Sequence, residues 1–540
     1  MSHESRVTRA ESQVLTHLLA ATAITSGAAV MMVEVLGARL MAPFFGVSLF
    51  VWTALIGVTL IALAFGYFAG GLFADRFDSP DPLFGMLIAA GSLVALVPAL
   101  KAPVLKAAML LGLRGGALTA ALVLFAPALA LLGAVSPCLL RLAAQRVEHL
   151  GRTAGALYAL STLGSFVGTV VTGFYLIALA GIDRIFQGIG AALIALGCIY
   201  FVRYRRRWLT AAALLVPVAV GTAPSQAVRQ LSDGTRVERI ASRDGFYGKV
   251  KVLDYSHGLQ SVRELVIDGL VQGGVDLATG QSVYEYAYLA ERLPRAIQPH
   301  GTRCLVIGLG IGVVPAWYRA QGVRTEAVDI DPEVVAFARA HFALDRQLPV
   351  HLTDARRYLG TTGEQYDYVL LDVFNGDTTP GHLLSLEAMH LVRSRLARSG
   401  VLAVNLIGDI GPQGRMTASV VKTLRAVFDQ VEVRPTFDPA RDGSVGNLLL
   451  LAYDGAPADV DPAQLDLESV HPLAREGVGY GWTHRVEPAA SDAIVLTDDF
   501  NPIDVSDLAV KERVRRRILE DTHWDILLGL GAPPTSLQPT

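Results

Sequence analysis

The sequence has few cysteines and no histidines at metal-ligand spacing. Its three cysteines, Cys138, Cys198 and Cys304, are too few and too scattered for a disulfide framework or a zinc site. The twelve histidines show no ligand pattern, so we predict no metal. A net charge of −3 gives no electrostatic attraction to nucleic acid. These absences exclude metal-dependent and nucleic-acid-binding classes and direct attention to other residues.

Apolar residues are present in excess and are unevenly distributed. They make up 52% of the 540 residues and give a mean hydropathy of +0.42, which is high for a soluble chain. The excess lies before about residue 222, where apolar segments alternate with short charged loops. We therefore predict a transmembrane helical domain over 1–222, a linker over 223–242, an α/β domain over 243–460 and a C-terminal extension over 461–540.

Several apolar segments reach the length of about 17–25 residues that crosses a lipid bilayer. We expect spans near 15–41, 50–74, 83–100, 115–138, 154–180 and 183–202, with a shorter seventh near 208–222. The segment 102–113 is too short to span, and we expect an interfacial helix there. Small residues such as Gly164, Gly168 and Gly173 suit close helix packing in lipid.

A glycine-rich loop follows the apolar strand expected at 304–308. It carries Gly308, Gly310 and Gly312, and a second strand ends in an acid, Asp329, about 20 residues later. Glycines allow the backbone to approach a ligand, and an acid at this spacing accepts hydrogen bonds from ribose hydroxyls. The pattern predicts a site for an adenosine-containing molecule.

Strands and helices alternate on both sides of this loop. Apolar strands are expected at 304–308, 324–329, 349–352, 366–373 and 401–406. Their alternation with helical segments predicts a doubly wound, Rossmann-like α/β domain with a mostly parallel sheet. A small β-hairpin region precedes it, with GKVKVLD, a turn at 256–258 and VRELVIDG, and a tyrosine-rich helix follows Gln272.

Acidic residues follow three of the expected strands. Asp329, Asp354 and Asp372 each lie at a strand's carboxyl end, where doubly wound sheets bind their ligands. A single aspartate in this place is usually a helix cap. Three at successive strand ends favour a ligand site.

This arrangement resembles the polyamine aminopropyltransferases, the spermidine synthase family, and in particular its bacterial membrane-fused members. The resemblance covers about residues 243–453, with weaker similarity in GARLMAPFFGVS, GYFAGGLFADR and the C-terminal LTDDFNP. The family's L-D-G-x-x-Q element corresponds to 267–272, and its late P-T-(Y/F)-P…G element corresponds to Pro435, Thr436 and Phe437 with Gly443.

The resemblance implies a role for each matched residue. The catalytic pair would be Asp372, which accepts the proton of the amine, and Tyr284, which orients it. The donor would be bound by Gln272, Gly308, Gly310, Gly312, Asp329, Asp354 and Ala355, and the amine by Glu285, Asn375, Asp377 and Phe437. An amine would attack the carbon next to a sulfonium, with decarboxylated S-adenosylmethionine as co-substrate, no permanently bound cofactor, a diamine as acceptor and a homodimer as assembly.

The sequence departs from the family pattern at the amine end of the site. Ile311 replaces the aspartate that anchors the donor's amino group, Asn375 replaces a second acid after Asp372, and Gly248 replaces a glutamine. The adenosine pocket is kept. An S-adenosylmethionine-dependent methyltransferase therefore stays open, as does a polyamine-binding transporter or sensor in which Glu34 and Arg39 of the membrane domain act.

Basic residues orient the chain in the membrane. Arginines at 6, 9, 76, 141, 146, 152, 203 and 205–207 share one side, which is the cytoplasm if the N-terminus is cytoplasmic. A complete seventh span would then place the α/β domain outside, whereas a re-entrant or surface segment at 208–222 would leave it inside. Because adenosine donors are cytosolic, we expect a multi-pass protein of the bacterial inner membrane with a cytoplasmic α/β domain.

Overall fold

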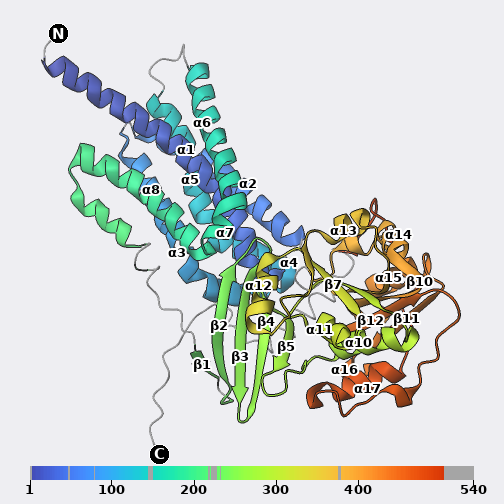
Figure 1. Cartoon of the computed structure of the whole chain (residues 1–540). Coiled ribbons are helices and arrows are strands. Elements are labelled where there is room, and N and C mark those ends of the chain that lie inside the picture. Colours follow the sequence, from blue (N-terminus) through green and yellow to red (C-terminus); the bar gives the residue numbers. More distant parts are fainter. Residues whose placement is uncertain are drawn as a thin grey trace, which may run out of the picture. The chain divides into compact units, whose positions relative to one another are not determined.

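The computed structural model describes residues 3–46, 49–77, 79–143, 150–216, 219, 228–231, 233–374 and 379–503. The chain separates into two units, Met1–Pro224 and Ser225–Thr540 (Figure 1). Each unit is described by itself.

The first unit is helical. Its elements are α1 (His3–Phe45), α2 (Leu49–Arg76), α3 (Asp81–Met109), α4 (Gly112–Leu124), α5 (Ala126–Ala143), α6 (Leu150–Val171), a π-helical turn (Thr172–Leu176), α7 (Ile177–Leu179), α8 (Ile182–Arg205) and a 3₁₀ helix (Trp208–Leu214). In the described part of the chain, six helical segments are long and apolar enough to cross a membrane. They are Val14–Phe45, Leu49–Arg76, Asp81–Met109, Ala126–Ala143, Leu150–Leu176 and Ile182–Arg205.

Two expectations for this unit were wrong. The segment 102–113 is not a separate helix, because α3 continues through Pro98 and Pro103 to Met109. The single span expected at 115–138 is divided into α4 and α5 at Phe125. Pro127 lies in the first turn of α5, where its missing N–H costs nothing, and a proline ring disfavours helical backbone in the residue before it.

The segment expected as a seventh span begins as a short 3₁₀ helix over Trp208–Leu214. At about 2.0 Å per residue, seven residues extend to roughly 14 Å, which is half of a bilayer's hydrocarbon core. Residues 217–218 and 220–227 lie outside the described part of the chain.

Glycines allow three pairs of these helices to pack closely. A β-carbon at Gly164 of α6 would lie 2.1 Å from the Ile24 carbonyl oxygen of α1, and one at Gly66 of α2 would lie 2.2 Å from that of Ala130 in α5. Gly91 of α3 meets Gly190 of α8 in the same way. Gly168 also packs against α1, as expected, whereas Gly173 has no neighbour within 4 Å. Glu34 of α1 forms a hydrogen bond with Thr59 of α2.

The second unit begins with a five-stranded antiparallel sheet. Its strands β1 (Val228–Gln230), β2 (Arg236–Asp244), β3 (Lys249–His257), β4 (Gln260–Ile267) and β5 (Leu270–Asp276) follow one another in order (Figure 1). The expected hairpin is formed by β3 and β4, and three further strands extend it. Alternation places Val250, Val252 and Leu265 on one face, where they pack against Ile311.

The unit continues with alternating helices and strands. These are α10 (Glu285–Ile297), β6 (Arg303–Ile307), α11 (Val313–Ala320), β7 (Arg324–Asp329), α12 (Pro332–His341), β8 (Val350–Leu352), α13 (Ala355–Thr361), β9 (Tyr366–Leu371), α14 (Leu386–Arg395), β10 (Leu396–Asp409), α15 (Arg415–Arg425), β11 (Gln430–Pro435), α16 (Pro439–Asp442), β12 (Val445–Tyr453) and α17 (Arg475–Thr483). The strand order is β11-β12-β10-β9-β6-β7-β8, with β12 antiparallel to both of its neighbours. The predicted doubly wound α/β fold is confirmed, with a mixed sheet.

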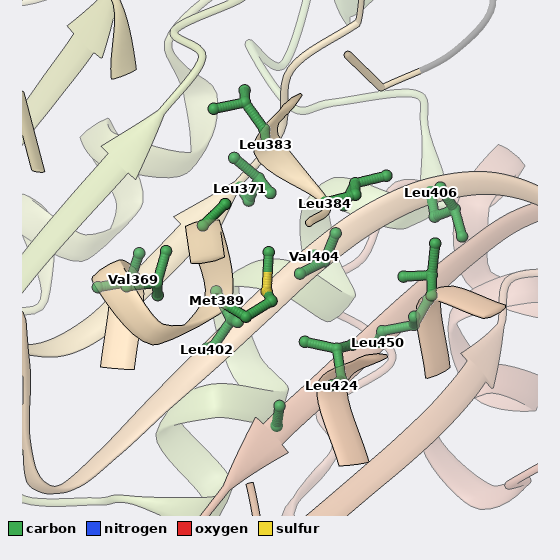
Figure 2. Close-up of a cluster of buried hydrophobic side chains, with 14 of the residues drawn as sticks. Val369, Leu371, Leu383, Leu384, Met389, Leu402, Val404, Leu406, Leu424 and Leu450 are labelled. Carbon is green, nitrogen blue, oxygen red and sulfur yellow. The ribbon is translucent and has the colours of Figure 1, made fainter. Parts of the chain in front are cut away.

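Successive side chains along each strand point to opposite faces of this sheet, and a hydrophobic core lies on each face. Figure 2 shows one of them, with Val369 and Leu371 of β9 and Leu402 and Val404 of β10 close to Met389 of α14. Tyr368, Leu370 and Ala403 point to the other face, under α10 and α11. Residues after 460 complete both cores, as Trp482 and Leu496 show.

Candidate active site

The candidate site lies where the strand order of the seven-stranded sheet reverses. β6 pairs in parallel with β7 on one side and with β9 on the other, so the loops after β6 and β9 diverge there. Such a point opens a crevice at the carboxyl ends of the strands. Gly308 follows β6 with φ of 89°, and a β-carbon there would lie 2.0 Å from the carbonyl oxygen of Asp372. Only glycine fits this approach of the two loops.

The rest of the glycine loop is shaped for close backbone contact. Gly310 has φ of 53°, and a β-carbon there would lie 3.2 Å from the carbonyl oxygen of Gln272 in β5. Gly312 has φ of 84° and directly precedes α11. These glycines allow the close backbone approach that a nucleotide-type ligand needs at such a loop.

Asp329 holds this loop from the end of β7. Its carboxylate accepts hydrogen bonds of 2.8 Å from the backbone N–H groups of Leu309 and Asp331. Burial raises the pKa of Asp329, and the backbone N–H groups act in the opposite direction. It does not cap α12, because Asp331 does so through the N–H of Glu333. A carboxylate fixed in this way keeps acceptor capacity for ribose hydroxyls.

Asp354 and Ala355 lie at the start of α13. Asp354 caps that helix by accepting a hydrogen bond from the N–H of Arg357 at 2.9 Å. His382 Nε2 lies 3.6 Å from its other carboxylate oxygen. The side chain of Ala355 is buried. The capping role that a lone strand-end aspartate usually has is thus present at Asp354.

Asp372 follows β9 and is held by the neighbouring strand. Its carboxylate accepts a 2.9 Å hydrogen bond from Nδ2 of Asn405, a buried residue of β10. Burial raises the pKa of Asp372 to about 6, and the Asn405 hydrogen bond lowers it. The Asn405 Oδ1 has no hydrogen-bond partner in the described part of the chain. This pair therefore combines a titratable carboxylate with an amide oxygen, Asn405 Oδ1, that accepts no hydrogen bond in the described part of the chain.

A small cavity connects this pair with the glycine loop. Its lining includes Gly308, Ile311, Asp372, Asn405 and Tyr286 of α10. The Tyr286 hydroxyl donates a 3.4 Å hydrogen bond to the Gln272 carbonyl oxygen. Burial raises the pKa of Tyr286, and the charge of Asp372 raises it further. A neutral tyrosine therefore faces the carboxylate at physiological pH.

Tyr284 is bound to a carboxylate of the five-stranded sheet. Its hydroxyl donates a 2.5 Å hydrogen bond to Glu264 of β4. Gly274 of β5 makes room for both side chains, because a β-carbon there would lie about 3 Å from each. Burial raises the pKa of Glu264, and the Tyr284 hydroxyl lowers it. Tyr286, which lines the cavity with Asp372, lies two residues after Tyr284 in the same segment.

Ile311 is part of an apolar cluster. It is 2% exposed and packs with Val250, Val252 and Leu265 of the five-stranded sheet. A β-carbon at Gly273 of β5 would lie 3.0 Å from it. The structure therefore gives the departure at this position a packing role and provides no carboxylate there.

The remaining amine-site residues are placed separately. Glu285 packs against Gly477 of α17, and burial raises its pKa. Phe437 lies against Gly446 of β12. Within the described ranges, neither forms a hydrogen bond with Asp372. Asn375 and Asp377 lie outside the described residues.

Three polar residues of the site were not predicted from the sequence: Glu264, Tyr286 and Asn405. Asn405 is a polar residue inside an otherwise apolar strand, and that interruption was an available signal. Tyr286 lies two residues after Tyr284, in the same tyrosine-rich segment. The sequence around Glu264 does not indicate a role for it, because its contact with Tyr284 forms only in the folded structure. Among the described residues, no group of three or more His, Cys, Asp or Glu side chains is placed to hold a metal ion.

Known proteins of two enzyme classes are similar to parts of this chain. No protein-family model matches the chain. It is 38% identical to a polyamine aminopropyltransferase of Vibrio vulnificus over 213 residues. This alignment covers 38% of this chain and 69% of that protein. It is 30% identical over 251 residues, 44% of each chain, to the N-terminal histidine N-methyltransferase of Emericella nidulans. The chain thus spans less than half of the latter relative's length.

One solved structure aligns with part of the chain. The crystal structure of a probable spermidine synthase from Corynebacterium glutamicum aligns with a TM-score of 0.40 and 20% identity. The alignment covers 48% of this chain and 96% of that one.

Proposed function

The chain belongs to the polyamine aminopropyltransferase family, and we propose that it transfers an aminopropyl group from decarboxylated S-adenosylmethionine to a diamine such as putrescine. The products are spermidine and methylthioadenosine. The observation that carries this proposal is the pair of Asp372 and Asn405 next to the glycine loop, at the point where the strand order reverses.

The reaction requires alignment and removal of one proton. The amine nitrogen attacks the carbon bonded to the sulfonium, the carbon–sulfur bond breaks, and its electron pair leaves with methylthioadenosine. Because an alkylamine has a reference pKa of about 10, a carboxylate must accept or relay the proton that it loses. Asp372 takes this role, since burial raises its pKa to about 6 and it remains ionised at neutral pH.

The donor occupies the glycine-loop side of the crevice. Asp329 accepts hydrogen bonds from the ribose hydroxyls while it fixes the loop through Leu309. Asp354 and Ala355, at the start of α13, contact the adenine ring. The backbone carbonyl oxygen of Gln272 lies across from Gly310, next to the glycine loop.

The acceptor amine occupies the side toward Tyr284. Tyr284 orients the amine, and Glu264 supplies the carboxylate that balances a positive charge at this end. Glu285, Asn375, Asp377 and Phe437 complete the amine site, with the Phe437 ring offering cation–π contact. Glu264 thereby replaces acids that the sequence lacks at positions 311 and 375.

One observation favours a second candidate function, methyl transfer from S-adenosylmethionine. The apolar packing of Ile311 leaves no carboxylate for the amino group of a decarboxylated donor. The identity with a histidine N-methyltransferase points in the same direction. The alignment covers 69% of the aminopropyltransferase relative and 44% of the methyltransferase relative, and together with Asp372 this makes aminopropyl transfer the better supported reaction.

The first unit anchors the protein in a bacterial inner membrane, with the second unit in the cytoplasm. The six apolar segments of the described ranges support this orientation, because an even number of spans returns the chain to the side of its N-terminus. The arginines that flank these segments support a cytoplasmic N-terminus. A homodimer remains the expected assembly.

A direct assay separates the two reactions. The full chain, purified in detergent, is incubated with putrescine and either decarboxylated S-adenosylmethionine or S-adenosylmethionine, and products are identified by mass spectrometry. We expect spermidine and methylthioadenosine, lost in Asp372→Asn and kept in the surface control Asp492→Asn. S-adenosylhomocysteine in place of these products would assign methyl transfer, and no turnover with either donor would reject both.

A further inference from the structure

A second and larger cavity opens on the α10–α11 face of the second unit. Its volume is about 1070 Å³, which is ample for a small-molecule ligand. Its walls come from the loop after β5, from α10 and α11, from the segment after α12 and from residues 464–482. It meets the glycine loop only at Gly312 and Val313, so it is not the crevice that contains Asp372.

One carboxyl group in this cavity has no partner. Glu291 of α10 is 5% exposed and lines the cavity, yet within the described ranges it forms neither a hydrogen bond nor an ion pair. Buried carboxylates are almost always paired, because an isolated charge in an apolar environment is costly. Burial raises the pKa of Glu291 to about 8, against the effect of nearby Arg292. A bound ammonium group would restore its ionised form.

Arg295 lies one helical turn further along α10 and also lines the cavity. Its Nη1 atom is buried and has no hydrogen-bond partner in the described part of the chain. Residues four apart on a helix share a face, but Glu291 and Arg295 do not form an ion pair with each other in this structure. Arg295 is only partly buried, so a ligand in the cavity would meet the exposed part of its side chain rather than the enclosed Nη1 atom.

The other charged groups of the cavity are already engaged. Asp276 accepts hydrogen bonds from the N–H groups of Ala278 and Thr279. Asp466 accepts from the N–H groups of Glu468 and Ser469. Arg292 donates to the Asp466 carbonyl oxygen at 3.0 Å and to the Ser469 hydroxyl at 3.0 Å. These contacts fix the cavity wall, so Glu291 and Arg295 are the charged groups that would contact a ligand.

Aromatic rings supply the apolar part of the lining. Trp317 of α11 and Phe342, after α12, are both partly buried and line the cavity. Tyr288 of α10 adds its ring, while its hydroxyl donates to the Ser282 carbonyl oxygen. A ligand with an apolar or aromatic group would bury that group against these rings.

From this geometry we propose that the cavity binds a small zwitterion, an α-amino acid with an apolar or aromatic side chain. Its ammonium group pairs with Glu291, its carboxylate pairs with Arg295, and its side chain packs against Trp317 and Phe342. Arg292 and Arg295 would repel the second charge of a diamine, and Glu291 would repel a dianion. The site goes beyond aminopropyl transfer.

Three related probes test the two charge contacts. L-phenylalanine, phenethylamine, which lacks the carboxylate, and 3-phenylpropionate, which lacks the amine, are titrated into the full chain in detergent by calorimetry. We expect L-phenylalanine to bind at least about tenfold more tightly than either analogue, because each analogue leaves one charged group unpaired. Saturating methylthioadenosine should not displace it.

Two variants assign the contacts separately. Glu291→Gln should abolish the preference for L-phenylalanine over 3-phenylpropionate and keep its preference over phenethylamine, whereas Arg295→Gln should do the reverse. Glu487→Gln, at an exposed carboxylate paired with Arg425, is the matched control and should leave all three affinities unchanged. Methylthioadenosine binding by each variant verifies that the fold is intact.

Several results would overturn the proposal. They are no binding of L-phenylalanine at millimolar concentration, equal binding of all three probes, competition with methylthioadenosine, or unchanged selectivity in both variants. A dimer that dissociates when Trp317→Ala is introduced would instead assign the cavity to contact between two copies. Loss of spermidine synthesis in the wild-type assay would reject the proposed reaction without affecting these binding measurements.

Discussion

Arg356 of α13 donates hydrogen bonds to both carboxylate oxygens of Asp498, 142 residues further along the chain, and each is 2.7 Å long. The Ser385 hydroxyl donates to the same carboxylate at 2.6 Å, and Asn501 donates to the Gly381 carbonyl oxygen. Hydrogen bonds from Arg356 and Ser385 lower the pKa of Asp498 to about 2. The C-terminal LTDDFNP segment therefore connects the start of α13 with the segment that follows Asp372.

Replacement of Asp498 should weaken donor binding. In Asp498→Asn the bidentate ion pair is lost, and α13, which begins directly after Asp354, is held less firmly. Because exposed ion pairs contribute up to about 1 kcal/mol, we expect the KM for the donor to rise about fivefold with little change in kcat. Steady-state kinetics at saturating diamine measure both constants.

The control for that variant is Asp492→Asn, which removes a more exposed ion pair with Arg415. It should leave the donor KM unchanged. Equal effects of the two substitutions would show that the Arg356–Asp498 pair has no special position relative to the site.

The pair of Asp372 and Asn405 predicts the pH dependence of the reaction. With the carboxylate as the proposed base, kcat/KM should rise as pH increases through about 6, the pKa of Asp372. In Asn405→Ala the hydrogen bond that lowers this pKa is lost, and the rise should move to higher pH. Asp372→Asn should reduce kcat by roughly 10²–10⁴-fold and remove the rise. An acid limb that stays in place in Asn405→Ala would contradict this assignment.

Much of the second unit could be predicted because its local signals agree with its tertiary structure. Strands expected at 324–329 and 349–352 are observed as Arg324–Asp329 and Val350–Leu352. The strand expected at 401–406 extends over Leu396–Asp409, because pairing with β9 and β12 recruits polar residues at its ends. Pairing of this kind depends on neighbours that are distant in the sequence.

The same distinction applies to the site. The glycine loop and Asp329 follow one local pattern, and the sequence contains both. The hydrogen bonds from Asn405 to Asp372 and from Tyr284 to Glu264 join different strands and helices, so no local pattern contains them. The sequence shows the loss of an acid at Ile311, whereas its apolar surroundings are visible only in the structure.

Glu264 and Tyr284 should affect the amine and not the donor. In Glu264→Gln the carboxylate charge is lost while the hydrogen bond to the tyrosine is retained. We expect the KM for putrescine to rise about tenfold, the effect of roughly 1.4 kcal/mol, with the donor KM unchanged. Tyr284→Phe should have a similar effect. In the double variant the KM for putrescine should rise by less than the two single effects combined, because the two groups share one hydrogen bond.

Glu238→Gln, at an exposed glutamate of β2 that pairs with Arg236, is the matched control and should have no effect on either KM. An increase in the donor KM alone, in Glu264→Gln, would place this carboxylate at the donor rather than at the amine.

Ile311→Asp restores the acid that the family pattern has at this position, and two ideas about the departure predict opposite results. If the missing carboxylate limits donor binding, the variant should bind decarboxylated S-adenosylmethionine more tightly. The structure predicts the reverse, because Ile311 is 2% exposed and surrounded by Val250, Val252 and Leu265. An unpaired polar group in such a cluster costs several kcal/mol, so we expect unfolding at a lower temperature and weaker donor binding. Thermal unfolding and donor titration of the full chain measure the two quantities.

Ile311→Val separates packing from charge in that experiment. It removes one methylene group and should reduce the free energy of unfolding by about 0.5–1.5 kcal/mol, with donor affinity nearly retained. If Ile311→Asp were as stable as the wild type and bound the decarboxylated donor more tightly, the aspartate would have to use the side of position 311 that borders the cavity with Asp372. The apolar cluster would then be dispensable, and the methyltransferase alternative would lose the structural observation that favours it. If Ile311→Asp is destabilised as expected, the chain must recognise the donor's aminopropyl group through other residues, and Glu264 is the first carboxylate to test.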